Sequence, residues 1–207
     1  MQKKLVVLLT LVLVFSVFSV VGAQEEVKKQ DTFTFATIGN QNTLDPHFSY
    51  DTGSAEIIDN VYENLLGYQG ESVTEFTPLL STEVPSEENG LIKDDGTTYI
   101  FPIREGVEFS NGNPLTPEDV KYSILRGLIT NRSGGAIWML YEPLLGVNGL
   151  QDVVNNVIGQ VDGEDLAPAD LTAEQSAKVY QELEKVIEID ENNVIFHLQD
   201  GPYPPFL

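Results

Sequence analysis

Two neighbouring carboxylates, Glu118 and Asp119, stand in the stretch FSNGNPLTPEDVKYSIL (109–125). Paired carboxylates are what a glycosidase requires. The residues before them favour a structural role, because Thr116 is a good helix N-cap and Pro117 suits the first helical position. Acidic side chains in the first turn favour the positive end of the helix dipole, and Asp119 stands where a capping box places its carboxylate. We predict that this pair begins a helix and has no catalytic or metal-binding role.

The rest of the chain offers little reactive chemistry. It has no cysteine and two histidines, His47 and His197, which stand 150 positions apart (197 − 47), so the sequence shows no thiol nucleophile and no zinc-type cluster. It also has neither a G-x-S-x-G motif nor a phosphate-binding glycine loop. We expect no catalytic residues, no metal and no cofactor. A secreted hydrolase stays open as an alternative, because the separation of two carboxylates in space cannot be read from sequence.

Two elements are predicted in the N-terminal part of the chain, a strand and a helix. Residues 31–38 (DTFTFATI) carry bulk on both faces, which predicts a buried strand. Residues 54–66 predict an amphipathic helix with Ile57, Val61 and Leu65 on one stripe. Gly67 then stands where a left-handed C-cap is expected.

The remaining predictions alternate strands with helices, which indicates a mixed α/β chain. They are a strand at 98–103, a short strand at 107–109, a helix from 117 through 128, an apolar stretch at 136–145, an acidic solvated linker at 162–170, a helix at 173–184 capped by Thr172, and a hairpin of 186–190 with 194–198.

The first 23 residues have the pattern of a secretory signal peptide. Lys3 and Lys4 precede an apolar run at 5–21, and Val21-Gly22-Ala23 offers small residues for cleavage before Gln24. The run lies at the lower edge of the length that spans a bilayer. With no cysteine near the cleavage point, a bacterial lipid anchor is excluded. We therefore expect an exported protein held in a periplasm.

The formal charge is −21, and removal of Lys3 and Lys4 makes it −23. Such a surface repels nucleic acid and anionic membranes, so neither is an expected partner.

Four ordered motifs resemble those of the family-5 extracellular solute-binding proteins, the receptors of ABC importers for peptides and nickel. The motifs are TLDPH (43–47), NVYENLLGY (60–68), DGTTYIFPIREGVEFSNGNPLTPEDVKYSILRGL (95–128) and NNVIFHLQDGPYPPFL (192–207). The long third motif is the most specific of them.

The resemblance implies an α/β fold of the periplasmic-binding-protein type II kind, with two lobes around a ligand cleft and an additional domain in the first lobe. Carried over, 24–62 would be a leader and the first segment of lobe one, and 63–207 most of the additional mixed α/β domain. Family members are more than twice this long, so we expect a fragment or a truncated product that binds ligand very weakly alone.

The resemblance also implies ligand-binding residues. The positions shortly after the LDP motif are Tyr50, Asp51, Thr52 and Gly53. The alternative for Thr52 and Gly53 is helix entry.

An aromatic residue after the Arg126 helix is implied as well, and Trp138 or Tyr141 is the nearest match. The alternative for Trp138 is packing in the core.

The implied function is the solute-binding component of an ABC importer. The ligand would be an oligopeptide, with an oligosaccharide as the alternative, and the partners would be the permease subunits.

Overall fold

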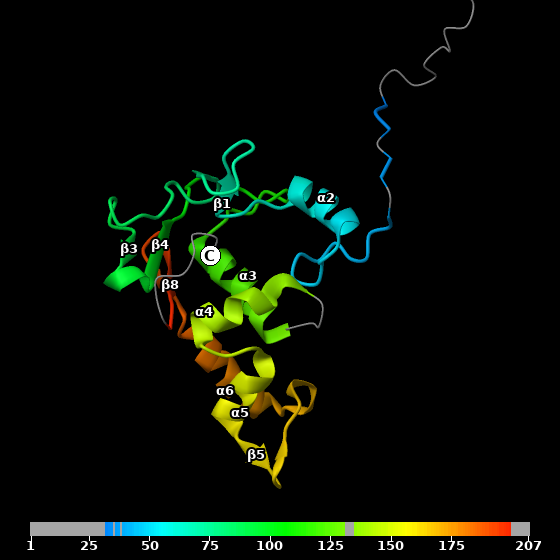
Figure 1. The fold of residues 1–207 in the computed structure, drawn as a ribbon, viewed down its shortest axis with the longest axis vertical. Helices are drawn as coiled ribbons and strands as arrows, with labels where there is room; N and C mark the ends of the chain where they lie inside the picture. The colour runs from blue at the N-terminus through cyan, green and yellow to red at the C-terminus, as the bar shows by residue number, and fades with distance from the viewer. Residues whose placement is uncertain (1–31, 35, 38, 131–134, 200–207) are drawn as a thin grey trace, which may run out of the picture. The chain divides into compact units, whose positions relative to one another are not determined.

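The computed structural model describes residues 32–34, 36–37, 39–130 and 135–199 (Figure 1). The chain falls into two units, Met1–Thr37 and Ile38–Leu207. The described residues of the first unit are exposed and form no strand, and Phe33 is 88% exposed. The buried strand predicted at 31–38 is therefore wrong for these residues. A strand needs a neighbouring strand to stabilise it, and an apolar pattern does not show whether one is present. The predicted signal peptide lies outside the described residues.

An antiparallel sheet forms the centre of the second unit, with the order β3-β4-β8-β7. Its strands are β3 (Ile92–Lys93), β4 (Thr98–Pro102), β7 (Ile187–Asp190) and β8 (Asn193–His197). Strand β4 pairs with β8 along its whole length, from Thr98 opposite His197 to Pro102 opposite Asn193. The predicted hairpin of β7 and β8 is confirmed, and it turns through Glu191 in a left-handed conformation.

Helices pack against this sheet and against each other. Their bounds are α3 (Pro117–Thr130), η2 (Ala136–Leu140), α4 (Tyr141–Leu145), α5 (Leu150–Ile158) and α6 (Ala173–Glu184). Helix α3 contacts β7, β8 and α6, and α5 lies against α6. The predicted helix at 173–184 is confirmed, including its start. Thr172 and Gln175 form a capping box in which each side chain accepts from the other's backbone N–H.

The start of α3 explains the acidic pair at 118–119. The Thr116 backbone N–H and the Thr116 hydroxyl both donate to Asp119 Oδ2, each over 2.8 Å. Asp119 therefore reaches back as a capping residue does, while Glu118 is exposed in the first turn. This confirms the structural interpretation of Asp119.

One hydrophobic core joins these elements, and burial of this apolar surface is what holds the sheet and helices together. Its most deeply buried side chains are Ile103, Leu125, Leu128, Tyr141, Leu144, Val154, Val179, Leu183, Ile187 and Val194. Helix α3 contributes Val120, Leu125 and Leu128 to this core, and Leu128 is fully buried.

The helix predicted at 54–66 is shorter than expected. Helix α2 spans Thr52–Val61, and Tyr62 is already extended (φ −105°, ψ 155°). Val61 is 71% exposed, so the predicted stripe is not buried there. The residues that follow pair instead as β1 (Leu66–Tyr68) with β2 (Phe76–Pro78), which places Gly67 in a strand and not at a left-handed cap. Strand pairing outweighed the helical pattern at this point.

Two short regions also differ from the sequence predictions. The short strand at 107–109 reduces to one bridge between Glu108 and Pro114. The acidic stretch contains a small exposed hairpin, β5 (Gln160–Val161) with β6 (Glu164–Asp165), followed by η3 (Pro168–Asp170). A short 3-10 turn, η1 (Asp94–Gly96), connects β3 to β4.

Candidate functional site

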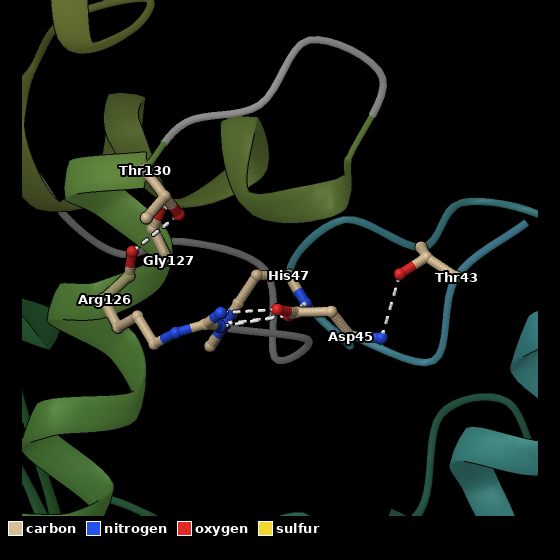
Figure 2. Close-up of polar contacts among 6 residues, drawn as sticks. All are labelled: Thr43, Asp45, His47, Arg126, Gly127 and Thr130. Carbon is tan, nitrogen blue, oxygen red and sulfur yellow. Dashed lines mark hydrogen bonds and ion pairs between the residues drawn. The ribbon is translucent and has the colours of Figure 1, made fainter.

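Asp45 and His47 from the loop before α2 meet Arg126 of α3, and we call these three residues the Arg126 junction (Figure 2). Arg126 Nη1 donates to Asp45 Oδ1 over 3.0 Å, and Nη2 donates to Oδ2 over 2.5 Å. The same Nη1 lies 2.6 Å from His47 Nδ1. Because a guanidinium only donates, His47 Nδ1 accepts this bond and carries no proton. The bidentate geometry is the strong form of an Arg–carboxylate contact.

The TLDPH motif forms the loop that positions Asp45 against Arg126. The Asp45 N–H donates to Thr43 Oγ1 over 3.2 Å, and the His47 N–H donates to Asp45 Oδ1 over 3.1 Å. The N–H groups of Phe48 and Ser49 both donate to the Asp45 carbonyl over 3.0 Å. Asp45 therefore organises its own turn and holds the helix partner with the same carboxylate.

Close packing brings the loop and α3 together. A Cβ on Gly127 would lie 2.6 Å from Ile137 Cδ1 and 2.8 Å from His47 Cδ2, so glycine permits the approach of both residues. The Phe48 ring also lies under the guanidinium, with Arg126 Cζ 5.7 Å from the ring centroid. This is a cation–π contact.

The charges of the junction shift one another's titration. The hydrogen bond from Arg126 lowers the pKa of Asp45 below its usual range, against the opposing effect of burial. Burial lowers the pKa of His47, and the charge of Arg126 lowers it further, while Asp45 acts in the other direction. The junction is thus built for an ionised Asp45 and a neutral His47.

Sequence reasoning placed the TLDPH motif and Arg126 in family motifs but missed that they pair. A signal was present, since an aspartate in a proline-containing loop and an arginine on a helix that packs into the core both need partners when the elements pack.

Tyr50, Asp51, Thr52 and Gly53 form the entry into α2. Asp51 is the N-cap, and its Oδ1 accepts from the Ser54 N–H over 2.9 Å. A Cβ on Gly53 would lie 3.3 Å from the Asn40 carbonyl oxygen, a tight contact that glycine avoids. Tyr50 and Thr52 are exposed, Tyr50 by 64%. Within the described residues, Asp51 Oδ2 is buried and has no hydrogen-bond partner.

Trp138 and Tyr141 lie in different environments although they are three residues apart. Trp138 on η2 is 56% exposed, so its interpretation as a core residue is wrong. Tyr141 is fully buried, and its hydroxyl donates to the Leu128 carbonyl. Tyr141 thus supports the segment that presents Trp138, and a ligand could reach Tyr141 only if the core opened.

An apolar cavity of about 410 Å³ lies between the β1–β2 pair, the central sheet and helices α3 and α4. Its aromatic lining is Tyr68, Phe76, Tyr99, Phe101 and Phe196. Ligand sites combine apolar walls with a few polar groups that fix orientation, and this lining is nearly all apolar. The cavity is therefore a weaker site candidate than the exposed loop at 50–53.

No group of three or more His, Asp or Glu side chains that could hold a metal ion occurs in 32–34, 36–37, 39–130 and 135–199. Over the same residues, no helix is both long and apolar enough to span a bilayer. The Nε2 atom of His197 on β8 lies 3.0 Å from Glu188 Oε2 on β7, so the two side chains form a cross-strand pair.

Residues 75–207 match the family described as "Bacterial extracellular solute-binding proteins, family 5 Middle". The match covers more than half of the chain, so the chain belongs to family 5 of the bacterial extracellular solute-binding proteins, and the sequence resemblance is confirmed.

Individual relatives match about half to two thirds of the chain. The chain is 30% identical over 99 residues to the "Probable deoxycholate-binding periplasmic protein YgiS" of Escherichia coli (strain K12), which covers 48% of this chain and 17% of that protein. It is 28% identical over 141 residues to the oligopeptide-binding protein OppA of Bacillus subtilis (strain 168), which covers 66% of this chain and 24% of that protein.

A solved structure confirms the fold class. The structure of a periplasmic oligopeptide-binding protein (OppAIV) from Borrelia burgdorferi superposes with a TM-score of 0.52 at 20% identity, over 78% of this chain and 26% of that one. The predicted mixed α/β fold of the type II periplasmic-binding-protein kind is therefore confirmed. The chain spans between 17% and 26% of the length of these three proteins.

Proposed function

We propose that this chain is part of an extracytoplasmic receptor that binds oligopeptides and delivers them to the permease subunits of an ABC importer. The match of residues 75–207 to the family carries the proposal. The names of two relatives, in Bacillus subtilis and Borrelia burgdorferi, support a peptide as ligand. An oligosaccharide stays the alternative.

The exposed entry into α2 is the proposed ligand surface of this part of the receptor. Tyr50 and Thr52 would face the ligand, while Asp51 and Gly53 hold the loop through the cap and the close approach to Asn40. Trp138 is proposed as a second contact, because an exposed indole offers a large flat apolar surface. The other contacts would come from the parts of such receptors that this chain does not span.

The proposed location is the periplasm, reached by a signal peptide cut after Ala23. The basic start, the apolar run and the small residues before Gln24 support this proposal. Mass spectrometry of the exported protein should show Gln24 as the first residue. A chain that begins at Met1 and sediments with membranes would contradict it.

We also propose that the protein binds its ligand without turnover. Asp119 has a capping role, and Asp45 is committed to Arg126. A hydrolase would need two carboxylates free to act as acid and as base or nucleophile.

Titration calorimetry on two proteins tests the function. One is the present chain, and the other is a longer chain that carries the remaining family segments. The injected ligands are short peptides, maltooligosaccharides and deoxycholate, and mass spectrometry then examines each ligand for products. We expect saturable binding of peptide by the longer chain, no saturable heat for the 207-residue chain at micromolar concentration, and unchanged peptide in both.

Substitutions in the longer chain locate the surface. Trp138→Ala should weaken peptide binding about tenfold, because the apolar contacts of a large aromatic residue at an interface contribute more than about 1 kcal/mol to the binding free energy. Met139→Ala is the matched control, since Met139 is the exposed neighbour on the same turn. Binding of sugar or deoxycholate in place of peptide would reject the ligand class. Cleavage of any ligand would reject the receptor.

A further inference from the structure

His47 holds a position in the Arg126 junction that depends on its protonation state. Its Nδ1 lone pair faces the Arg126 Nη1 donor at 2.6 Å, and its side chain is 12% exposed. The ring edge carrying Cδ2 packs where Gly127 has no side chain. The ring therefore has little room to turn away from the arginine while the loop stays in place.

The groups around the ring define how it responds to acid. Asp45 on its own loop is the nearest acid, with Oδ1 3.6 Å from Nδ1, and Arg126 on α3 is the facing cation. Tyr62, at the end of α2, and Tyr122, on α3 itself, both act on the charge of Arg126. Gly127 and Ile137, which pack close to the ring edge, and Phe48, which lies against Arg126, carry no titratable side chain.

We propose that the Arg126 junction is a proton-operated latch, closed on α3 while His47 is neutral and released when His47 is protonated. This inference goes beyond the proposed function and does not depend on it, because the groups involved are all within the described chain.

Protonation of Nδ1 would set two donors against each other. The new N–H would point at Arg126 Nη1, so the accepted hydrogen bond would be replaced by a contact between two cations. Asp45 offers limited compensation, because each of its carboxylate oxygens already accepts a hydrogen bond from Arg126. The imidazolium would have to draw Oδ1 away from the arginine or leave the site. Either route loosens the turn that Asp45 organises.

The burial of the ring agrees with this assignment. Burial and the arginine charge both lower the pKa of His47 from its ordinary value of 6.5, which means that the closed junction favours the neutral ring. By linkage, protonation must favour the open junction to the same extent.

Release would reach beyond the junction. The amides of Phe48 and Ser49 are held by the Asp45 carbonyl, and the next four residues, 50–53, lead into α2. The entry into α2 would therefore become mobile together with the loop.

Nuclear magnetic resonance of the 207-residue chain tests the latch between pH 7.5 and 4.5. The readouts are the His47 ring signals and the hydrogen-exchange protection of the Phe48 and Ser49 amides, corrected for the intrinsic effect of pH. We expect the ring to titrate below pH 6.5 and the protection of both amides to fall about tenfold through the same midpoint, as local opening predicts. The His197 amide, which donates to the Val186 carbonyl within the sheet, should keep its protection.

Three variants make the test specific. His47→Asn keeps an acceptor near the Nδ1 position but cannot be protonated, so its amide protection should not change with pH. Arg126→Gln removes the cation, so the His47 midpoint should rise. His197→Asn is the control and should behave as the parent chain. The proposal is overturned if the ring titrates at or above 6.5, if Phe48 and Ser49 stay protected while it titrates, or if His47→Asn loses protection in acid.

Discussion

Asp45 and Arg126 stand 81 residues apart in the sequence and are joined by two hydrogen bonds of 3.0 and 2.5 Å. This pair fixes the loop before α2 to the helix that packs on the central sheet. It therefore links the first described loop of the second unit to the core by polar contacts, in a region where helix α2 itself buries only Gly53 and Ser54.

Removal of the Asp45 charge should weaken this link. We expect Asp45→Asn to lower the free energy of unfolding by about 1 kcal/mol, because both side chains are partly exposed and water screens the pair. Urea denaturation measures the loss. In a double-mutant cycle with Arg126→Lys, the second substitution should lower the free energy of unfolding little further. Either substitution alone already removes the two-point contact, which lysine cannot reproduce.

An exposed pair on α6 serves as the control for that cycle. Lys178 and Glu174 form an ion pair at 2.9 Å with both side chains more than half exposed. Lys178→Gln should leave the urea midpoint nearly unchanged. Full additivity of the Asp45 and Arg126 substitutions would show that their contact has no energetic weight.

Gly127 should tolerate no larger residue. Gly127→Ala would place a methyl group into contacts of 2.6 and 2.8 Å with Ile137 and His47, which should destabilise the chain by about 1–3 kcal/mol despite the better helix propensity of alanine. Thermal unfolding monitors this change. Ser123→Ala, on the exposed side of α3, is the matched control and should be neutral or slightly stabilising. Equal stability of both variants would mean that the loop does not pack on α3 as described.

Stability should fall in two separate steps as the solution is acidified. The folded pKa of His47 lies below 6.5, so the unfolded chain takes up that proton first, and stability is lost as pH falls from 6.5 through the folded value. The folded pKa of Asp45 lies below 3.8, so its contribution is present above 3.8 and is lost as pH falls through the folded value. Glu174 behaves like Asp45, starting from 4.5.

Urea midpoints measured every half pH unit separate these steps. Between pH 6.5 and 4.5, His47 is the one group with a shifted pKa among the described residues that changes charge. His47→Asn should therefore flatten the curve in that interval and keep the step below it. A parent chain that gains stability from pH 6.5 to 4.5 would contradict the sign.

The start of α6 offers a test of capping that is independent of the junction. Thr172→Ala should cost about 1 kcal/mol, because it leaves the Gln175 N–H without its side-chain acceptor. At α3, Asp119→Ala should cost more than Thr116→Ala, since Asp119 accepts from both the backbone and the hydroxyl of Thr116. Circular dichroism during thermal unfolding measures all three variants. If Asp119→Ala left the unfolding temperature unchanged, the capping explanation of the acidic pair would be wrong.

The sequence predicted best where local chemistry decides structure. Helix α6 begins after Thr172 and ends at Glu184 as its cap and apolar stripe predict, and the β7–β8 hairpin follows its alternating pattern. These elements satisfy local and tertiary preferences together.

Predictions failed where partners distant in sequence decide. The helical pattern at 54–66 yielded to the pairing of Leu66 with Pro78, and the described residues around Phe33 form no strand. The Arg126 junction was not predicted for the same reason, because its two halves belong to separate motifs. The exposure of Trp138 could not be inferred either, since an apolar stretch does not show which of its side chains face outward.

The pairing of β4 with β8 sets the time at which this fold can form during synthesis. Thr98 lies opposite His197, so 99 positions (197 − 98) separate the two halves of the longest ladder in the central sheet. At ribosomal rates of about 5–20 residues per second, β4 waits several seconds before β8 exists. Until then Tyr99 and Phe101 lack their β8 partners, Phe196 and Val194, on one side of the strand. The central sheet therefore cannot be completed until nearly all of this region has been made. An incompletely folded chain can pass through a narrow translocation channel, and until it folds a chaperone would have to protect its apolar surface.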